Sequence, residues 1–127
     1  MAKILIVDDA KINRMILLQF LKDRYEVLQA EDGLEAIEVF RGNEKQIKAV
    51  ILDAVMPVSS GYDFLAAARK HGWLDHTPVI MVSTDCGEAS VRKAFEEGAT
   101  DFIRRPVDCR TVQRKVEAAI ERFHKGM

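Results

Sequence analysis

The amino-acid sequence predicts an α/β protein built on a doubly wound, five-stranded parallel sheet. Aliphatic runs rich in Val and Ile recur at residues 4–7, 49–52 and 79–82. Such unbroken runs are typical of strands that are buried on both faces of a parallel sheet. Helical periodicity fills the gaps between the strands, and no Pro/Gly/Ser-rich linker or repeat interrupts the alternation.

Length and composition indicate one globular domain over residues 1–127. The chain has 127 residues, of which 48% are hydrophobic and 31% are charged, as in ordinary globular proteins. The formal net charge is -1, so the chain as a whole offers no basic surface to a nucleic acid or an anionic membrane. We therefore expect neither nucleic acid nor membrane among its direct partners.

The cysteines and the absence of a long apolar run predict a cytoplasmic protein. Cys86 and Cys109 do not form a CxxC pair, so a disulfide framework is not expected. No apolar run reaches the roughly 18 residues that a membrane span needs. The first residues lead directly into a strand pattern, without the apolar region of a signal peptide.

The N-terminal part of the chain contains the first two strand–helix pairs. The strand at residues 4–7 precedes a helix on which one face carries Ile12, Met15, Ile16 and Phe20. A more polar strand at residues 25–30 fits the edge of a sheet. Asp32 and Glu35 then have the N-cap and N3 spacing of a capping box. They predict the start of a helix whose apolar face carries Leu34, Ile37 and Phe40.

The third and fourth pairs follow the same pattern. The strand at residues 49–52 precedes an alanine-rich, helix-prone segment at residues 62–70. After the strand at residues 79–82, Asp85 and Glu88 have the N-cap and N3 spacing of a capping box and predict a helix capped by Asp85. The apolar residues of that helix are Val91, Ala94 and Phe95.

The fifth pair and the helix ends complete the pattern. Residues 100–103 form a second polar strand, and Asp108 is a suitable N-cap for the longest helix. Its apolar side carries Val112, Val116, Ala119, Ile120 and Phe123. Gly72 and Gly98 stand where the third and fourth helices end.

The order of the strands decides where a ligand would bind. Parallel strands joined by right-handed helical crossovers give a doubly wound sheet, and five strands favour the flavodoxin-like order 2-1-3-4-5. In that order the ligand crevice lies at the carboxyl ends of strands 1 and 3. The residues that follow those strands are therefore the candidates for function.

Polar side chains follow four of the five strands. Asp8 and Asp9 follow the first strand, Asp53 the third, Ser83 the fourth, and Arg105 the fifth. Because strands 1 and 3 are neighbours in this order, the three carboxylates are expected to lie within a few ångströms of one another.

Three adjacent carboxylates repel one another unless a cation offsets their charge. Mg²⁺ prefers oxygen ligands and binds carboxylates together with phosphates. Arg105 can neutralise further charge, and the Ser83 hydroxyl can donate a hydrogen bond to a phosphoryl oxygen. An aspartate beside Mg²⁺ is a competent nucleophile for phosphoryl transfer, which makes Asp53 the candidate phosphoacceptor.

Each of these residues also has a simpler interpretation. Asp9 can cap the helix that begins near Lys11, and Ser83 can be an ordinary turn residue. The placement of carboxylates, a hydroxyl and a cation at four strand ends together favours a functional site.

Over essentially its whole length the chain resembles the receiver domains of two-component response regulators. The matching features, in chain order, are Asp8-Asp9, Asp53 followed by Met56-Pro57 and Gly61, Ser83 thirty residues after Asp53, and Phe102 before Arg105-Pro106. The motifs are weak singly and specific in this order.

The resemblance implies a role for each site residue. Asp53 matches the phosphoacceptor, Asp9 the direct Mg²⁺ ligand, and Asp8 a carboxylate farther from the ion. The backbone carbonyl of Val55 would complete the metal site. Ser83 matches the switch hydroxyl, and Phe102 the aromatic residue that follows its movement. Arg105-Pro106 is a candidate for a cis peptide bond.

The resemblance also implies the partners. A histidine kinase or phosphotransfer protein would donate the phosphoryl group to Asp53 in the presence of Mg²⁺. The protein would be a phosphoacceptor that takes part in its own phosphotransfer and dephosphorylation rather than an enzyme. Its response surface, and a possible homodimer face, would be formed by the fourth helix, fifth strand and fifth helix.

The chain departs from the family at Arg105, where the family has lysine. Arginine is a wider planar fork, which can pair with a phosphate or instead hold Asp53 in a permanent ion pair. The alternative function is therefore a phosphorylation-independent, receiver-like interaction module. Thr84 replaces a smaller residue and predicts slower phosphotransfer or hydrolysis. Val55 cannot orient water and predicts a longer-lived phosphoryl group.

An enzyme on the same fold is the third hypothesis. A flavin site needs hydroxyl- and glycine-rich residues after the first strand, whereas Asp8-Asp9 would repel the flavin phosphate. A phosphatase with an aspartyl nucleophile would need a D-x-D motif there, and the two aspartates of this chain are adjacent. Both enzyme classes are disfavoured.

Overall fold

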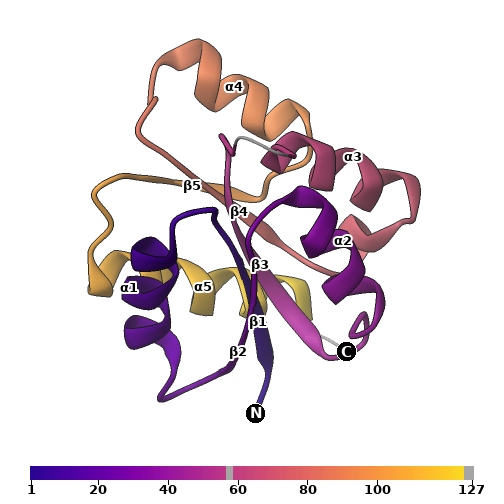
Figure 1. Ribbon diagram of the computed structural model, residues 1–127, viewed down its shortest axis with the longest axis vertical. Helices are drawn as coiled ribbons and strands as arrows, with labels where there is room; N and C mark the ends of the chain where they lie inside the picture. The colour runs from indigo at the N-terminus through magenta and orange to yellow at the C-terminus, as the bar shows by residue number, and fades with distance from the viewer. Residues whose placement is uncertain (57–58, 125–127) are drawn as a thin grey trace.

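A five-stranded parallel sheet forms the centre of the protein (Figure 1). The computed structural model describes residues 1–56 and 59–124. The strand order is β2-β1-β3-β4-β5, and every neighbouring pair is parallel, as predicted. The strands are β1 (Lys3–Val7), β2 (Glu26–Ala30), β3 (Ile47–Asp53), β4 (Val79–Ser83) and β5 (Asp101–Arg104). The two polar strands, β2 and β5, form the edges of the sheet.

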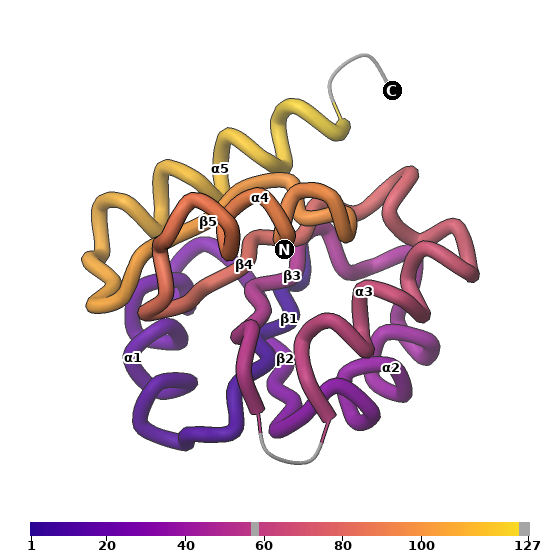
Figure 2. Tube along the Cα trace, turned by 90° about the horizontal axis from the view of Figure 1, so that it is seen from above, coloured from indigo at the N-terminus to yellow at the C-terminus, as the bar shows by residue number. Residues whose placement is uncertain are grey.

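Helices cover both faces of the sheet, which confirms the doubly wound arrangement. They are α1 (Lys11–Leu21), α2 (Gly33–Arg41), α3 (Gly61–Lys70), α4 (Glu88–Glu96) and α5 (Cys109–His124). Figure 2 shows α1 and α5 on one side of the strands and α2 and α3 on the other. Within residues 1–56 and 59–124, no helix combines the length and the apolar character needed to cross a membrane.

The apolar runs are unbroken because both faces of each central strand are buried. Ile4 and Ile6 of β1 pack into the core beneath α1 and α5. The alternate residues, Leu5 and Val7, pack into the core beneath α2 and α3. All four side chains are at most 1% exposed. The central strands are therefore packed from both sides.

Helix α1 lies where it was expected but presents a different face to the sheet. The residues it buries are Arg14, Leu17 and Leu21. Of the predicted apolar face, Ile12, Met15 and Ile16 are 63%, 45% and 37% exposed, and Phe20 packs at the edge of the core. The prediction failed because a buried arginine occupies the stripe that an apolar pattern would assign to aliphatic residues.

The start of α4 is a second correction. The helix begins at Glu88 with Gly87 as its N-cap, so Asp85 does not cap it as predicted. Asp85 instead accepts hydrogen bonds from the Gly87 amide at 3.1 Å and the Ser90 hydroxyl at 2.6 Å. The Asp85 carboxylate therefore bonds to residues at the start of the helix without capping it, and α4 begins later in the chain than predicted.

The other predicted helix ends agree with the structure. Asp32 caps α2 by accepting from the Glu35 amide at 2.8 Å, and Asp108 accepts from the Thr111 amide at 2.9 Å. Gly72 and Gly98 have φ of 74° and 117°, a left-handed conformation that follows α3 and α4. The short 3₁₀ helix η1 (Trp73–Asp75) and the capping box of α3, formed by Ser60 and Asp63, had not been predicted.

Candidate functional site

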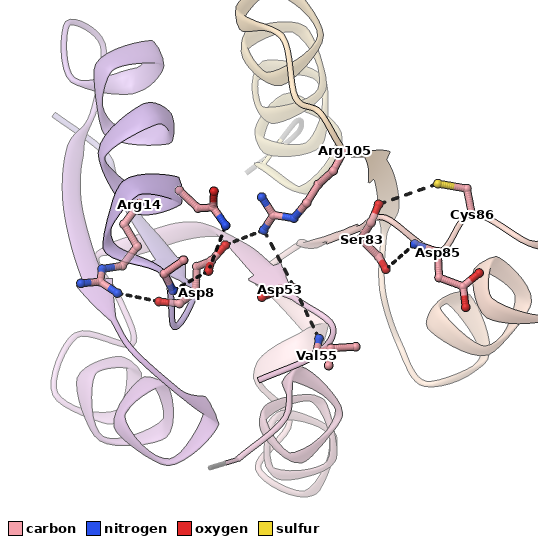
Figure 3. A network of polar contacts seen from close by, with 10 residues as sticks. Asp8, Arg14, Asp53, Val55, Ser83, Asp85, Cys86 and Arg105 are labelled. Atoms are coloured by element: carbon pink, nitrogen blue, oxygen red, sulfur yellow. Dashed lines mark hydrogen bonds and ion pairs between the residues drawn. The ribbon is translucent and has the colours of Figure 1, made fainter. Parts of the chain in front are cut away.

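The carboxyl edge of the sheet brings the predicted acidic residues together, as Figure 3 shows for Asp8 and Asp53. Asp8 follows Val7 and Asp53 follows Leu52, and these two strand residues are paired in the sheet. One carboxylate oxygen from each of Asp8, Asp9 and Asp53 lies within 4.8 Å of the others. The predicted convergence of the three carboxylates is confirmed.

Asp9 belongs to this cluster and does not cap a helix. The N-cap of α1 is Ala10, and it forms no side-chain capping bond. The Asp9 side chain is exposed at the rim of the cluster. The capping interpretation of Asp9 is therefore not supported by the structure.

Asp8 is the buried member of the cluster, with 1% of its surface exposed. Its Oδ1 accepts from the Ala10 amide at 2.9 Å and from the Asn13 amide group at 3.5 Å. Its Oδ2 accepts from Arg105 Nη2 at 2.5 Å. A buried carboxylate needs such partners to remain charged, and these contacts come from two different sides of the site.

Arg14 supports Asp8 from behind and was missed by the sequence analysis. Its Nη1 donates to the Asp8 carbonyl at 2.7 Å, and its Nε donates to the Gln29 side chain at 3.1 Å. Arg14 is 7% exposed, and its Nη2 forms an ion pair at 3.6 Å with Glu31, whose side chain is 67% exposed. An arginine on the inner stripe of α1 is the signal that could have identified it, because a buried guanidinium needs acceptors.

Asp53 lies in an environment that resists its ionisation. Burial raises its pKa, the neighbouring Asp8 carboxylate raises it further, and Arg105 and the Val55 amide lower it, so that the pKa is about 6. Both contacts of the carboxylate with the described residues fall on Oδ1, from Val55 N at 3.4 Å and Arg105 Nη2 at 3.9 Å.

Arg105 pairs mainly with Asp8 rather than with Asp53. The 2.5 Å contact with Asp8 is a direct hydrogen bond, whereas 3.9 Å to Asp53 Oδ1 is only an ion pair. The peptide bond between Arg105 and Pro106 is cis, as predicted. The contact between Arg105 and Asp53 is therefore looser than the permanent ion pair that the alternative hypothesis requires.

The remaining predicted residues lie after β3 (Val55), at the end of β4 and just after it (Ser83 and Thr84), and within β5 (Phe102). Ser83 is buried, and its hydroxyl accepts from the Asp85 amide at 3.0 Å. A hollow of about 140 Å³ is bordered by Val55, Ser83 and the half-buried ring of Phe102. Val55 is 76% exposed, and Thr84 is also exposed. Pro57, part of the matched motif, lies outside the described residues.

The donor set fits a magnesium ion. Octahedral Mg²⁺ places opposite oxygen ligands about 4.2 Å apart, since each bond is about 2.1 Å long. Carboxylate oxygens that lie within 4.8 Å of one another can approach that geometry with small side-chain movements. Asp9 and Asp53 are the residues that would hold the ion, because Arg105 already occupies Oδ2 of Asp8.

Comparisons with known proteins identify the family to which the chain is similar. A family model described as the response regulator receiver domain matches residues 4–117. Two-component response regulator ORR13 of Oryza sativa subsp. japonica is 33% identical over 112 residues, which cover 87% of this chain and 92% of the relative. ORR3 of Oryza sativa subsp. indica is 30% identical over 112 residues, with coverage of 87% and 85%.

Solved structures show the same similarity. Chemotaxis protein CheY4 of Vibrio cholerae superposes with a TM-score of 0.86 at 30% identity, covering 94% of this chain and 98% of CheY4. A receiver domain protein of Clostridium thermocellum gives a TM-score of 0.87 at 32% identity, with 96% of each chain covered. The CheX–CheY–BeF₃–Mg²⁺ complex of Borrelia burgdorferi gives 0.85 at 28% identity, covering 92% and 87%.

Proposed function

The chain belongs to the family of response regulator receiver domains, and from this premise we propose that Asp53 is its phosphoacceptor. Receivers of this family interact with histidine kinases and phosphotransfer proteins, and here such a protein would be the phosphodonor. The observation that carries the proposal is the position of Asp53, at the end of a central strand beside Asp8 and Asp9. Residues 1–127 would act as one receiver domain in the cytoplasm.

The proposed reaction transfers a phosphoryl group from a donor histidine to the carboxylate. An oxygen of Asp53 attacks phosphorus, a P–O bond forms, the P–N bond breaks, and the imidazole leaves and takes up a proton. Oδ2 is the candidate nucleophile, because the described contacts of Asp53 fall on Oδ1. Asp53 must be ionised to attack, so its environment has to tolerate a carboxylate at neutral pH.

Asp9 and Asp53, with the Val55 carbonyl, would hold Mg²⁺ at this site, and Asp8 would complete the acidic cluster farther from the ion. The ion supplies charge stabilisation for the phosphoryl oxygens in transfer. The chain contributes the positioning: Ala10 and Arg105 hold the buried Asp8, and Asp53 is fixed at the end of β3. Because these groups take part in the transfer without turning over a separate substrate, we regard the protein as a phosphoacceptor rather than an enzyme.

The switch residues would transmit the modification. The Ser83 hydroxyl would turn from the Asp85 amide toward the phosphoryl group, since it is the buried hydroxyl at the end of the strand beside β3. The hollow between Ser83 and Phe102 offers space for the ring to follow. A change there would reach the face formed by α4, β5 and α5, where Phe95 is 44% exposed. This face is also the candidate homodimer surface.

The exposed residues of α1 support docking of a protein donor next to the site. Ile12 and Ile16 are exposed one to two turns after Asp9. A groove of about 390 Å³ runs beside them between α1 and the segment after β5, lined by Asn13, Ile16, Thr84, Arg105, Pro106 and Val107. Apolar contacts beside the polar site would hold a partner protein in one orientation, with its donor histidine next to Asp53.

The proposal is tested by incubating the chain with a small phosphodonor and Mg²⁺ and measuring its intact mass. We expect a phosphate-sized mass gain that is lost in Asp53→Asn and retained in Asp75→Asn. Asp75 is an exposed aspartate of η1 and lies away from the acidic cluster. A gain that persists in Asp53→Asn would contradict the assignment of the phosphoacceptor.

The second candidate is a phosphorylation-independent interaction module. The observation in its favour is the guanidinium of Arg105, which already pairs with two carboxylates of the site. No mass gain with a small donor, and none with a cognate kinase, would support this module over the switch.

A further inference from the structure

The guanidinium group of Arg105 lies inside the acidic cluster rather than at its rim. Its Nη2 is 2.5 Å from Asp8 Oδ2 and 3.9 Å from Asp53 Oδ1. The Arg105 side chain is 16% exposed, and those of Asp8 and Asp53 are 1% and 13% exposed. Figure 3 shows the side chain reaching from the end of β5 across to these two residues. One of the three negative charges is thus already offset by the protein itself.

A second cation at this site would share oxygens and space with that guanidinium. Any ion held by Asp53 lies on a carboxylate whose Oδ1 is also within ion-pair distance of Arg105. Like charges repel strongly where side chains are largely removed from water, because the effective dielectric constant is low. The cation must therefore bind more weakly than three carboxylates alone would allow, or displace the guanidinium.

The structure offers a place for a displaced guanidinium. The groove between α1 and the segment after β5 adjoins Arg105 and has a volume of about 390 Å³. Its walls are partly apolar, and Asn13 and the exposed Thr84 are polar residues among them. The long stem of arginine allows its head group to move while the backbone stays in place, and that backbone is tied to β4 by the Arg105 amide and the Ser83 carbonyl at 3.0 Å.

We propose that Arg105 is an internal counter-cation of Asp8 that competes with the divalent ion and sets the Mg²⁺ concentration at which the site fills. The inference rests on the proposed function, since it concerns the same metal. It adds that the Mg²⁺ affinity of this receiver is set by an internal charge, because the ion must bind beside the guanidinium or displace it.

The test is a calorimetric titration of the full chain with MgCl₂, without a phosphodonor. Arg105→Gln removes the competing charge, and we expect it to bind Mg²⁺ roughly tenfold more tightly than the unmodified chain. Arg104→Gln is the matched control, because it removes the same charge from the exposed neighbouring residue. We expect its affinity to stay within about twofold of the unmodified chain, since exposed charges are well screened.

A second measurement keeps the inference testable if Arg105→Gln does not fold. In the unmodified chain, the side-chain Nε–H resonance of Arg105 is followed by NMR during the same titration. We expect it to shift until Mg²⁺ saturates the site. Equal affinities for Arg105→Gln and Arg104→Gln, or an unchanged resonance at saturation, would overturn the inference alone. If no form of the chain binds Mg²⁺, the proposed Mg²⁺-dependent phosphotransfer fails as well.

Discussion

Asp53 has to be charged in order to react, yet its surroundings favour its protonated form. Burial and the nearby Asp8 carboxylate raise its pKa from 3.8 to about 6, although Arg105 opposes the rise. At neutral pH the carboxylate form still predominates, so the residue can act as a nucleophile. Ionisation of Asp53 therefore lowers the free energy of unfolding, because the same carboxyl group ionises more easily in the unfolded chain.

This conflict predicts a pH-dependent gain of stability in Asp53→Asn. Between pH 4 and 6 the folded state binds a proton at Asp53 that the unfolded state releases, so the free energy of unfolding of the unmodified chain falls as pH rises. The Asp53→Asn variant has no ionisable group at this position, so its free energy of unfolding does not fall for this reason. In EDTA at pH 7.5 we expect Asp53→Asn to be more stable by on the order of 2 to 3 kcal/mol, measured by urea denaturation.

The gain should shrink as pH falls through about 6 and be mostly lost near pH 4, where the folded-state carboxyl group is protonated and the unfolded-state group is about half protonated. The exposed Asp75 provides the control, and Asp75→Asn should change the free energy of unfolding by less than about 0.5 kcal/mol at either pH. A gain of equal size at pH 4 and pH 7.5 would contradict the electrostatic cause.

At the scale of elements, the distance between α3 and β3 depends on a glycine. A Cβ added to Gly61 would clash with the backbone oxygen of Asp53 and lie 3.1 Å from Leu52 Cγ. The helix therefore approaches the strand end more closely than any other residue at position 61 would allow. The helix also carries its own capping box, formed by Ser60 and Asp63.

Gly61→Ala should therefore destabilise the protein by about 2 kcal/mol, because a backbone atom cannot move aside as a flexible side chain can. Gly42→Ala is the matched control. Gly42 has φ of -77°, and the nearest atoms to an added Cβ are 3.8 Å away. That substitution should be neutral or stabilise by about 0.5 kcal/mol. Equal effects of the two substitutions in urea denaturation would contradict the close approach.

The outward face of α1 makes a separate prediction about the phosphodonor. Ile12 is 63% exposed, so Ile12→Asp should leave the free energy of unfolding within about 0.5 kcal/mol. If a protein donor docks on α1, its kcat/KM for phosphotransfer should fall by about tenfold, which corresponds to losing one important apolar contact. Phosphorylation by a small donor should not change.

Phe95→Asp on α4 is the control for this experiment, because Phe95 is also an exposed apolar residue, with 44% of its surface exposed. Its substitution should leave transfer from the protein donor unchanged. An equal loss in both variants would indicate a general effect of added negative charge rather than docking on α1.

For the molecule as a whole, the topology could be predicted from the sequence because burial on both faces leaves unbroken aliphatic runs. Parallel strands also place all their carboxyl ends at one edge, which predicted the meeting of Asp8, Asp9 and Asp53. The inner face of α1 was predicted wrongly, because Arg14 is buried through hydrogen bonds such as the one to the Asp8 carbonyl, which hydrophobic periodicity does not register. The main partner of Arg105 could not be predicted from the sequence either. The distances from Arg105 Nη2 to the Asp8 and Asp53 carboxylates, 2.5 and 3.9 Å, differ too little for sequence position to separate them.

Metal binding should be visible in the stability of the whole molecule. An ion that binds only the folded state at ten times its dissociation constant adds about 1.4 kcal/mol to the free energy of unfolding. We expect this gain when Mg²⁺ replaces EDTA at matched ionic strength. Asp9→Asn should lose most of the gain, because Asp9 is the exposed ligand candidate. An equal gain from NaCl at that ionic strength would indicate screening rather than a bound ion.

The position of η1 has a practical consequence. Trp73 is the single tryptophan of the chain, and it is 7% exposed and packs against Phe40 with ring centroids 4.6 Å apart. It precedes β4, whereas Asp53 ends β3, so the indole lies toward the amino edge of the sheet and the site lies at the carboxyl edge. The intrinsic fluorescence of this protein will therefore report the melting of its core and stay largely silent about events at Asp53. A fluorescent reporter of phosphorylation would have to be introduced near the site, and the exposed Val55 is a suitable position for an added indole.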